Sequence, residues 1–80
     1  MFDVGDSVRV ISSSNVYDVL YCDNLKLLDE YKQGTSVYIG YTTKVRAVLR
    51  DYFGLGIKCY KLERTGDYLW DDSSIVLSNY

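Results

Sequence analysis

Residues 60–70 read Tyr-Lys-Leu-Glu-Arg-Thr-Gly-Asp-Tyr-Leu-Trp and contain the only tryptophan of the 80-residue chain. They predict a hairpin, with one strand over 57–63, a tight turn at 65–67 and a partner strand over 68–70. A second strand signal lies at the other end of the chain, in Val4-Gly5-Asp6-Ser7-Val8-Arg9-Val10. We expect the first and last strands to pair and to close a small β domain.

The intervening segments supply the remaining strands. Alternating apolar residues predict strands over 6–11 and 35–41, and Ile75-Val76-Leu77 predicts a last short strand. Residues 44–52 fit both a helix and a strand, but no strong helix cap precedes them and glycines follow them, which favours the strand. Asp71-Asp72-Ser73-Ser74 predicts a single helical turn, because short polar side chains cap free backbone N–H groups.

One helix is predicted in the long segment after the first strand. Apolar residues recur at helical spacing over 24–32, after the N-cap residue Asp23 and before Gly34, a residue typical of helix ends. Residues 16–22 fit either an arm of a long loop or a short strand.

The apolar positions of these elements predict a single core. Positions that share one face of each strand, or one stripe of the helix, are expected to point inward. The predicted core residues are Val8, Val10, Leu28, Val37, Ile39, Leu49, Leu62, Leu69 and Ile75.

Length and composition bound the class of protein. Eighty residues predict one domain spanning 1–80, and no apolar run approaches the ~20 residues that cross a bilayer. The N-terminal residues lack the pattern of a signal peptide, so a cytoplasmic protein is expected. Cys22 and Cys59 are expected to pack as reduced, small apolar residues, and a disulfide requires their Cα atoms to lie within about 7 Å.

Charge is distributed unevenly along the chain. Residues 44–64 hold six basic and two acidic residues, a local net charge of +4, whereas the remainder holds three basic and nine acidic residues, a net charge of −6. The chain therefore has a basic centre and acidic flanks.

The order of these elements is that of a five-stranded Src-homology-3-like barrel, mainly β, with a short helix in its long first loop. The chain also resembles small proteins of this fold that bacteriophages and prophages encode. They begin with a motif like residues 4–10, place a short helix ending near a sequence like Tyr31-Lys32-Gln33-Gly34, and end with a tryptophan strand like Tyr68-Leu69-Trp70-Asp71-Asp72. The resemblance covers most of the chain and implies a fold and a viral setting, the host cytoplasm, but no mechanism. A departure is the stretch 38–53, which is longer than the pattern needs and leaves room for an additional strand or helix.

Enzymatic chemistry finds little support in the residues. The chain has no histidine to act as a base near neutral pH, and neither cysteine has an evident activating partner. Gly54-Leu55-Gly56 lacks the spacing and the lysine of a phosphate-binding loop, and Asp71-Asp72 is typical of a solvated turn rather than a metal site. We therefore predict a protein that is not an enzyme and has no cofactor and no metal.

Protein binding is the function that the sequence favours. Phe53 and Leu55 are large apolar residues on a glycine-flanked turn, which indicates either a contact site or a plug of the barrel end. Tyr17, Tyr21, Tyr68 and Trp70 could form an aromatic groove for a peptide, with Trp70 in the core as the alternative. The acidic residues Asp67, Asp71 and Asp72 could meet a basic surface. The predicted contact residues are Tyr52, Phe53, Leu55, Tyr68, Trp70, Asp71 and Asp72. The resemblance suggests a phage accessory protein that modulates or inhibits a host or defence protein.

The alternative is a single-stranded nucleic-acid-binding barrel, in which cations follow the phosphates and aromatic rings stack on bases. The residues predicted for this role are Lys44, Arg46, Arg50, Lys58, Tyr60 and Arg64. The acidic flanks weaken the attractive field that such binding requires. A homo-oligomer that uses the apolar loop as its self-contact is a third possibility.

Overall fold

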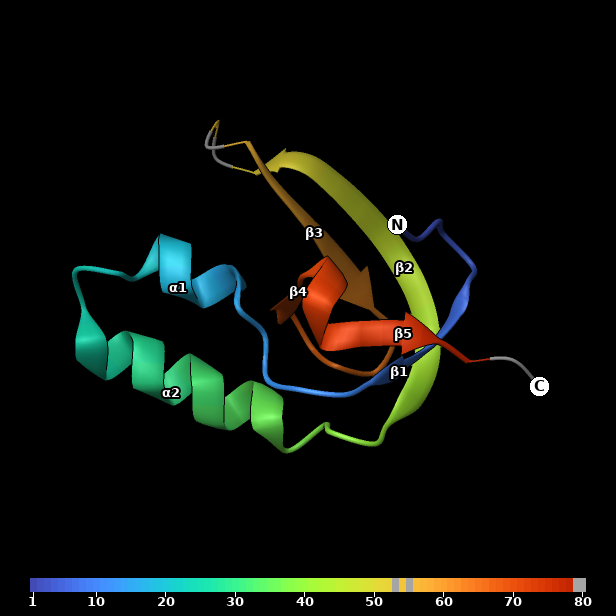
Figure 1. Cartoon of the computed structure of the whole chain (residues 1–80), viewed down its shortest axis with the longest axis horizontal. Coiled ribbons are helices and arrows are strands. Elements are labelled where there is room, and N and C mark those ends of the chain that lie inside the picture. The colour runs from blue at the N-terminus through green and yellow to red at the C-terminus, as the bar shows by residue number, and fades with distance from the viewer. Residues whose placement is uncertain (53, 55, 79–80) are drawn as a thin grey trace.

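The first and last strands lie side by side in the computed structural model, which describes residues 1–52, 54 and 56–78. The elements in chain order are β1 (Ser7–Val10), α1 (Val16–Leu20), α2 (Leu25–Ser36), β2 (Thr42–Tyr52), β3 (Ile57–Leu62), β4 (Leu69–Trp70), the 3-10 turn η1 (Asp72–Ser74) and β5 (Ile75–Leu77). Antiparallel pairing joins β1 to β5, with Val8 opposite Leu77 and Val10 opposite Ile75. The predicted pairing of the first and last strands is therefore confirmed (Figure 1).

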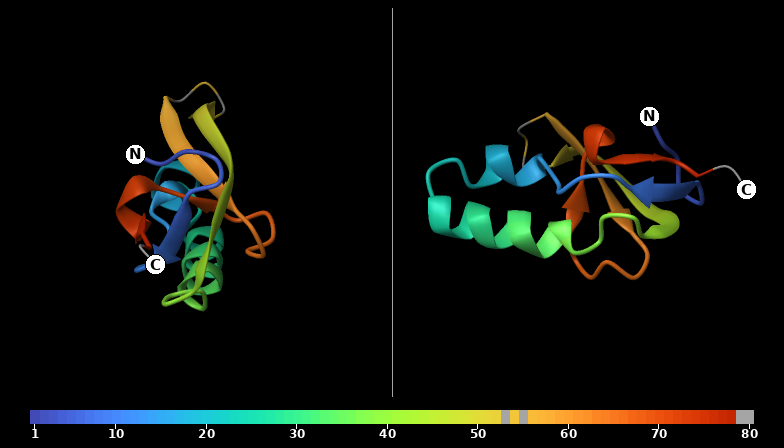
Figure 2. Two further views of the ribbon diagram at one scale, coloured as in Figure 1. Left: turned by 90° about the vertical axis from the view of Figure 1, so that its right-hand side faces the viewer. Right: turned by 60° about the horizontal axis from the view of Figure 1, so that its bottom comes forward.

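The five strands form one antiparallel sheet in the order β4-β3-β2-β1-β5. Within the described part of the chain, β4 and β5 are the edges of this sheet, and η1 connects them directly. The molecule is thus a small, mainly β domain with two short helices. Both helices lie beside β3 and β4, on the side remote from the N-terminus (Figures 1 and 2).

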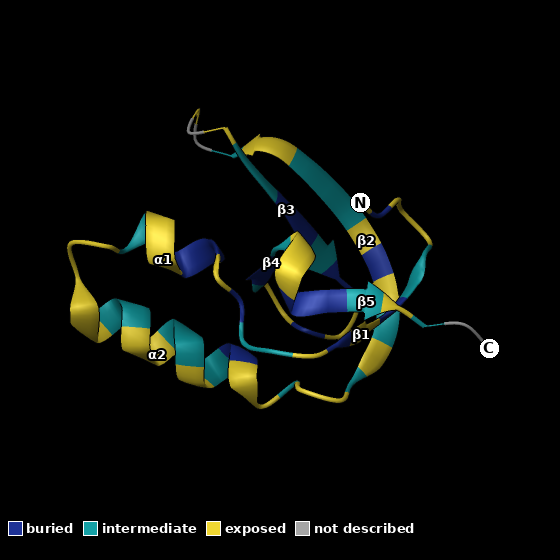
Figure 3. Ribbon diagram, viewed as in Figure 1, coloured by how far each residue is buried: buried dark blue, intermediate teal, exposed yellow. Residues whose placement is uncertain are grey.

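Strand β3 is apolar on both faces because successive side chains of a strand point in opposite directions. Tyr60 and Leu62 enter the first core, whereas Ile57 and Cys59 contact the second core. The buried residues of the first core are Phe2, Val8, Val10, Val45, Tyr60, Leu62, Trp70 and Ile75. The buried residues of the second core are Val16, Tyr17, Cys59 and Leu69, with partly buried residues of α1 and α2 packed against them. The helices therefore cover the outer face of the β3–β4 hairpin (Figure 3).

Strand β2 confirms the strand expected over 44–52 and explains why its sequence also fits a helix. Val45 lies opposite Leu62 and Val48 opposite Tyr60, with a register shift between Val45 and Ala47. This irregularity inserts one extra residue, so two side chains three positions apart both reach the first core. A second shift precedes Tyr52, and the strand curves along its length (Figure 1).

Two local predictions are wrong. Residues 16–20 form helix α1 instead of a loop or strand, and the strand expected over 35–41 is absent because α2 continues to Ser36. The buried Thr35 hydroxyl donates to the Tyr31 carbonyl at 2.8 Å and accepts from the backbone N–H of Ser14 at 3.1 Å. These bonds hold the last turn of α2 against the segment that leads into α1. Helix α2 is therefore longer than the predicted 24–32.

The helix ends also differ from the prediction. The N-cap is Asn24 rather than Asp23, and the Asn24 side chain accepts from the Leu27 backbone N–H at 3.2 Å. Gly34 lies inside the helix rather than beyond its end. After the helix, backbone turns carry residues 37–41 to β2.

Most core residues predicted on the strands are buried, whereas the two predicted after the helix are exposed. Val37 and Ile39 are wrong, since they are 76% and 53% exposed. Leu28 and Leu49 are partly buried and pack on the second core. The confirmed core residues are Val8, Val10, Leu62, Leu69 and Ile75.

The two cysteines differ in environment and are both free thiols. Cys59 is buried in the second core, and this burial raises the pKa of its thiol. Cys22 is exposed, so its expected packing role is wrong. Among the described residues, no helix combines the length and apolarity needed to cross a bilayer.

Candidate protein-binding site

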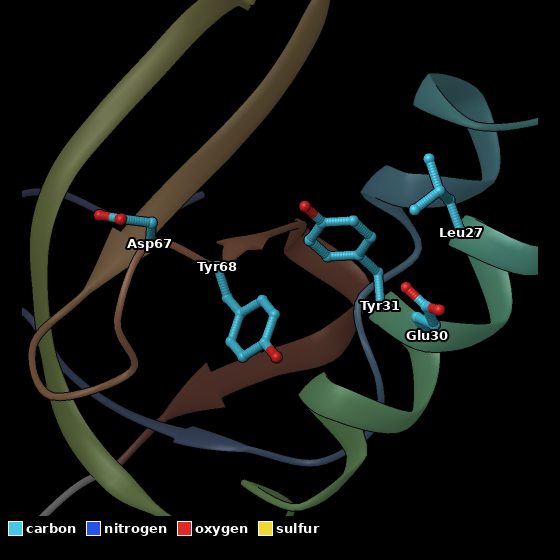
Figure 4. Close-up of a pocket in the computed structure, with 5 residues that line it drawn as sticks. All are labelled: Leu27, Glu30, Tyr31, Asp67 and Tyr68. Atoms are coloured by element: carbon cyan, nitrogen blue, oxygen red, sulfur yellow. The ribbon is translucent and has the colours of Figure 1, made fainter.

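A hollow of about 400 Å³ lies between α2 and the segment that enters β4 (Figure 4). Its lining residues are Leu27, Glu30, Tyr31, Asp67 and Tyr68, and we call it the α2 hollow. Figure 4 shows the rings of Tyr31 and Tyr68 side by side, with Leu27 and Glu30 on the helix side and Asp67 beyond Tyr68. Aromatic, aliphatic and acidic groups therefore meet on one surface.

Helix α2 presents three of these residues because positions three and four apart share a helix face. Leu27, Glu30 and Tyr31 occupy successive turns, and the Asn24 cap holds the first of these turns. Glu30 is exposed, whereas Leu27 and Tyr31 are half-buried.

A stack of three tyrosine rings fixes Tyr31. The Tyr31 ring lies 4.4 Å from the Tyr17 ring and 5.1 Å from the Tyr21 ring, with interplanar angles of 16° and 17°. The hydrogen bond between the Tyr21 and Tyr31 side chains, together with burial, raises the pKa of Tyr21. These contacts hold α1 against α2, so the position of the Tyr31 ring is fixed by residues from both helical segments.

The Tyr17 hydroxyl connects this stack to the sheet. It accepts from the backbone N–H of Leu69 at 2.8 Å, which satisfies a donor on edge strand β4. Burial raises the pKa of Tyr17 to about 12. Because Tyr17 is only 3% exposed, its predicted place in an open aromatic groove is wrong.

Tyr68 forms the other side of the α2 hollow. Its ring contacts the rings of Tyr31 and Tyr38 edge-on, each with centroids 6.0 Å apart. Tyr38 in turn contacts the indole of Trp70 at 6.1 Å. The Tyr68 hydroxyl lies directly over Gly34, where a Cβ atom would be 2.2 Å from it. The absence of a side chain at Gly34 thus admits the tyrosine.

The close approach at Gly34 predicts that Gly34→Ala destabilises the protein by up to about 2 kcal/mol. The overpacking penalty of roughly 1–3 kcal/mol exceeds the gain of about 1 kcal/mol in helix propensity. In a Tyr68→Ala background the clash is gone, so the same substitution should stabilise by up to about 1 kcal/mol. Urea unfolding of the four proteins gives both values. The same sign in both backgrounds would contradict this contact.

Asp71, a predicted contact residue, is occupied by internal hydrogen bonds. Its carboxylate accepts from the Asn15 backbone N–H at 2.9 Å, from the Asn15 amide at 3.4 Å and from the Ser73 hydroxyl. Burial alone would raise the pKa of Asp71, but the hydrogen bonds from Ser73 and Asn15 lower it below its ordinary value. Lys32 donates to Asn15 at 2.8 Å and pairs with Asp18 at 3.1 Å. This network ties α1 and α2 to η1.

Asp72 and Trp70 also have structural roles. The Asp72 carboxylate accepts from the Tyr60 hydroxyl at 2.6 Å and lies 3.6 Å from the N-terminal ammonium. Trp70 is fully buried in the first core, and its indole N–H donates to the Thr65 hydroxyl at 3.2 Å. The prediction of Trp70 as a surface contact is therefore wrong, whereas its alternative place in the core is confirmed.

Of the other predicted contact residues, Tyr52 is half-buried and packs against the second core. Phe53 and Leu55 lie outside the described residues. Among the predicted contact residues that the structure describes, only Tyr68 lines the α2 hollow.

The cations predicted for nucleic-acid binding are in part exposed. Lys44, Arg46 and Arg50 are exposed along β2, and Arg64 is exposed in the turn after β3. Lys58 is half-buried, with its ammonium 5.9 Å from the Tyr60 ring centroid. Lys44 and Arg64 border a second hollow of about 250 Å³, which also contains Glu63.

The predicted base-stacking role of Tyr60 is wrong. The ring is fully buried, and its hydroxyl accepts from the Phe2 backbone N–H at 3.2 Å while donating to Asp72. The exposed cations therefore lack the aromatic platform that Tyr60 was expected to supply.

Sequence reasoning identified Asp67 and Tyr68 but missed the contribution of α2 to the α2 hollow. In the sequence, Leu27 and Tyr31 are recognisable only as apolar residues of a helix, and no pattern around Glu30 indicates a binding residue. Among the described residues, no group of three or more histidine, cysteine or acidic side chains is placed to hold a metal ion. Comparisons of the chain with family models, curated proteins and solved structures yield no match.

Proposed function

We propose that this chain is a non-enzymatic protein-binding domain and that the α2 hollow is its contact site. The observation that carries the proposal is the pairing of two tyrosine rings with two exposed carboxylates. Among the described residues, neither Glu30 nor Asp67 forms an ion pair, in contrast to Asp18 and Asp72. Tyrosine is enriched at protein interfaces, and unpaired surface charges favour a partner of opposite sign.

The rigidity of the α2 hollow supports this function. Tyr31 is fixed by its stack and Tyr68 by Gly34 and Tyr38, so little side-chain entropy remains to be lost on binding. Aromatic residues held in this way are typical of the few positions that dominate binding energy. The pKa of the buried Cys59 thiol is raised, which is opposite to the shift that activates a nucleophile and supports a role without catalysis.

The wider setting is part of the same proposal. The order of elements and the pairing of β1 with β5 support a Src-homology-3-like architecture, with a helix pair in the first loop. By its resemblance to small phage proteins of that fold, the chain is proposed to act in the host cytoplasm. There it would bind and modulate a host or defence protein by covering part of its surface.

Affinity purification with a charge-reversed variant tests the contact site. Immobilised wild type should enrich a specific protein from bacterial host lysate, and Glu30→Lys should abolish that enrichment, because a central charged contact is worth on the order of 2 kcal/mol or more. The matched control is Glu63→Lys, an exposed acid at the second hollow, which should leave recovery unchanged.

Recovery that is insensitive to Glu30→Lys would move the contact away from the α2 hollow. Recovery of nucleic acid in place of protein, with a steep loss of binding as salt rises, would favour the basic surface of β2 instead.

A further inference from the structure

We infer, as an extension of the proposed protein-binding function, that the α2 hollow receives an arginine side chain of the partner protein. The arrangement of the aromatic rings favours this ligand. Tyr31 and Tyr68 lie edge-to-face at 85°, with 6.0 Å between their centroids (Figure 4). Perpendicular tyrosines form a corner, and the electron-rich face of an aromatic ring attracts a cation within about 6 Å.

The charge around this corner also favours a cation. Glu30 on α2 and Asp67 in the turn before β4 line the hollow, and the Asp67 carboxylate points away from the two rings (Figure 4). Among the residues that the structure describes, no basic side chain lines the hollow. Lys32 is engaged by Asn15 and Asp18. Lys26, four residues before Glu30, is exposed and forms no ion pair with it within the described structure. The hollow is therefore negative and uncompensated.

The chemistry and size of the hollow favour a guanidinium group over an ammonium group. A guanidinium is planar and weakly hydrated, so it can stack on one tyrosine ring while its N–H fork donates to a carboxylate such as Glu30. The volume of about 400 Å³ lies near the lower end of the roughly 300–1,000 Å³ of small-ligand pockets, which suits one long side chain better than a peptide segment. Leu27 offers an apolar wall for the methylene stem of that side chain.

The experiment uses three short blocked peptides that differ only at their central residue: arginine, lysine or the uncharged arginine analogue citrulline. Each is titrated into the full 80-residue protein and followed by two-dimensional 15N–1H NMR. The arginine peptide should shift the amide resonances of residues 27–31 and 67–68 and bind roughly tenfold more tightly than the citrulline peptide, because a charge-assisted hydrogen bond and a cation–π contact are lost together.

Variants of the exposed acids locate the charge. Glu30→Gln and Asp67→Asn should each weaken binding of the arginine peptide by roughly threefold or more, as expected for loss of one charge partner. Glu63→Gln, which leaves the hollow unchanged, should bind as wild type does. Spectra of the free variants show directly whether each remains folded.

Equal affinity for arginine and citrulline peptides would overturn the inference of a cation site, and equal affinity for arginine and lysine would overturn the choice of guanidinium. Absence of shifts at 27–31 and 67–68 would also overturn it. If these tests fail while lysate recovery still depends on Glu30, the inference falls and the protein-binding proposal stands. If the arginine peptide binds but no protein is recovered, the α2 hollow is a guanidinium site, and the protein-binding function, with the partner arginine inferred from it, falls.

Discussion

Replacing Trp70 with alanine is expected to unfold most of the protein at 25 °C. The indole is fully buried in the first core, where its N–H donates to Thr65 and its ring meets Tyr38. Truncation of a buried tryptophan costs about 3–5 kcal/mol. A core of this size rarely supplies more than roughly 3–5 kcal/mol of net stability, so the free energy of unfolding of the variant should fall to about zero. Far-UV circular dichroism and NMR dispersion measure the loss without relying on tryptophan fluorescence.

Two substitutions of Thr65 serve as controls for the Trp70 prediction. Thr65→Val keeps the shape but leaves the indole N–H buried without an acceptor, which should cost about 1–3 kcal/mol without unfolding the domain. Thr65→Ser keeps the hydroxyl and should cost less. A Trp70→Ala protein with a native spectrum and an unchanged urea midpoint would show that the indole is not a core residue.

The β framework was predictable because its signals are local. Glycines and short polar residues mark the turns, and alternation marks the strands, so β3, β4, η1 and β5 lie where the pattern placed them. The bulges of β2 are not visible in a single strand, because a bulge is defined by the residues of the partner strand. The pattern over 44–52 therefore remained ambiguous until β3 was paired with it.

The helices could not be delimited in the same way, because tertiary contacts determine their extent. Alternation from 35 to 41 indicated a strand, but Thr35 hydrogen-bonds both within α2 and to the backbone of Ser14, far away in sequence. Gly34 had the sequence signature of a helix end, yet inside α2 it makes room for Tyr68. Propensity is a weak prior that such packing overrides.

The α2 hollow was only half predictable for a related reason. Its β4 side follows from the hairpin, but its helix side depends on which face of the sheet α2 covers. A signal was present in β3, where Cys59 and Tyr60 are apolar on opposite faces, as expected for a strand buried on both sides. That pattern predicts a covering layer over the outer face, and the apolar stripe of α2 is the element available to form it.

The second large effect is expected at alkaline pH and depends on Tyr60. The Tyr60 hydroxyl accepts from Phe2 and donates to Asp72, and burial, with the Asp72 hydrogen bond, raises the pKa of Tyr60 to about 12. The folded state thus retains a proton that the unfolded chain releases near pH 10. The resulting stability is complete below pH 10 and is lost as the pH rises from 10 to 12. Two pKa units correspond to a loss on the order of 3 kcal/mol.

The variant Tyr60→Phe separates this effect from general alkaline destabilisation. At pH 7 it should be less stable than wild type by about 1–3 kcal/mol, because the Phe2 N–H loses its buried acceptor. Between pH 8 and pH 11.5, however, its free energy of unfolding should fall less steeply, since no buried phenol ionises at that position. Tyr17, whose pKa is also raised to about 12 by burial, continues to contribute in both proteins.

Urea unfolding at half-unit pH intervals measures both slopes, and Tyr41→Phe, which removes a phenol outside both cores, is the matched control. Wild type and Tyr41→Phe should lose stability in parallel above pH 10, and their curves should converge with that of Tyr60→Phe as the pH approaches 12. Parallel curves for wild type and Tyr60→Phe would mean that the Tyr60 phenol ionises as readily in the folded state as in the unfolded chain. The first core would then not exclude water from the contact between Tyr60 and Asp72. Other residues would have to hold the N-terminal segment against η1, where the N-terminal ammonium lies 3.6 Å from Asp72.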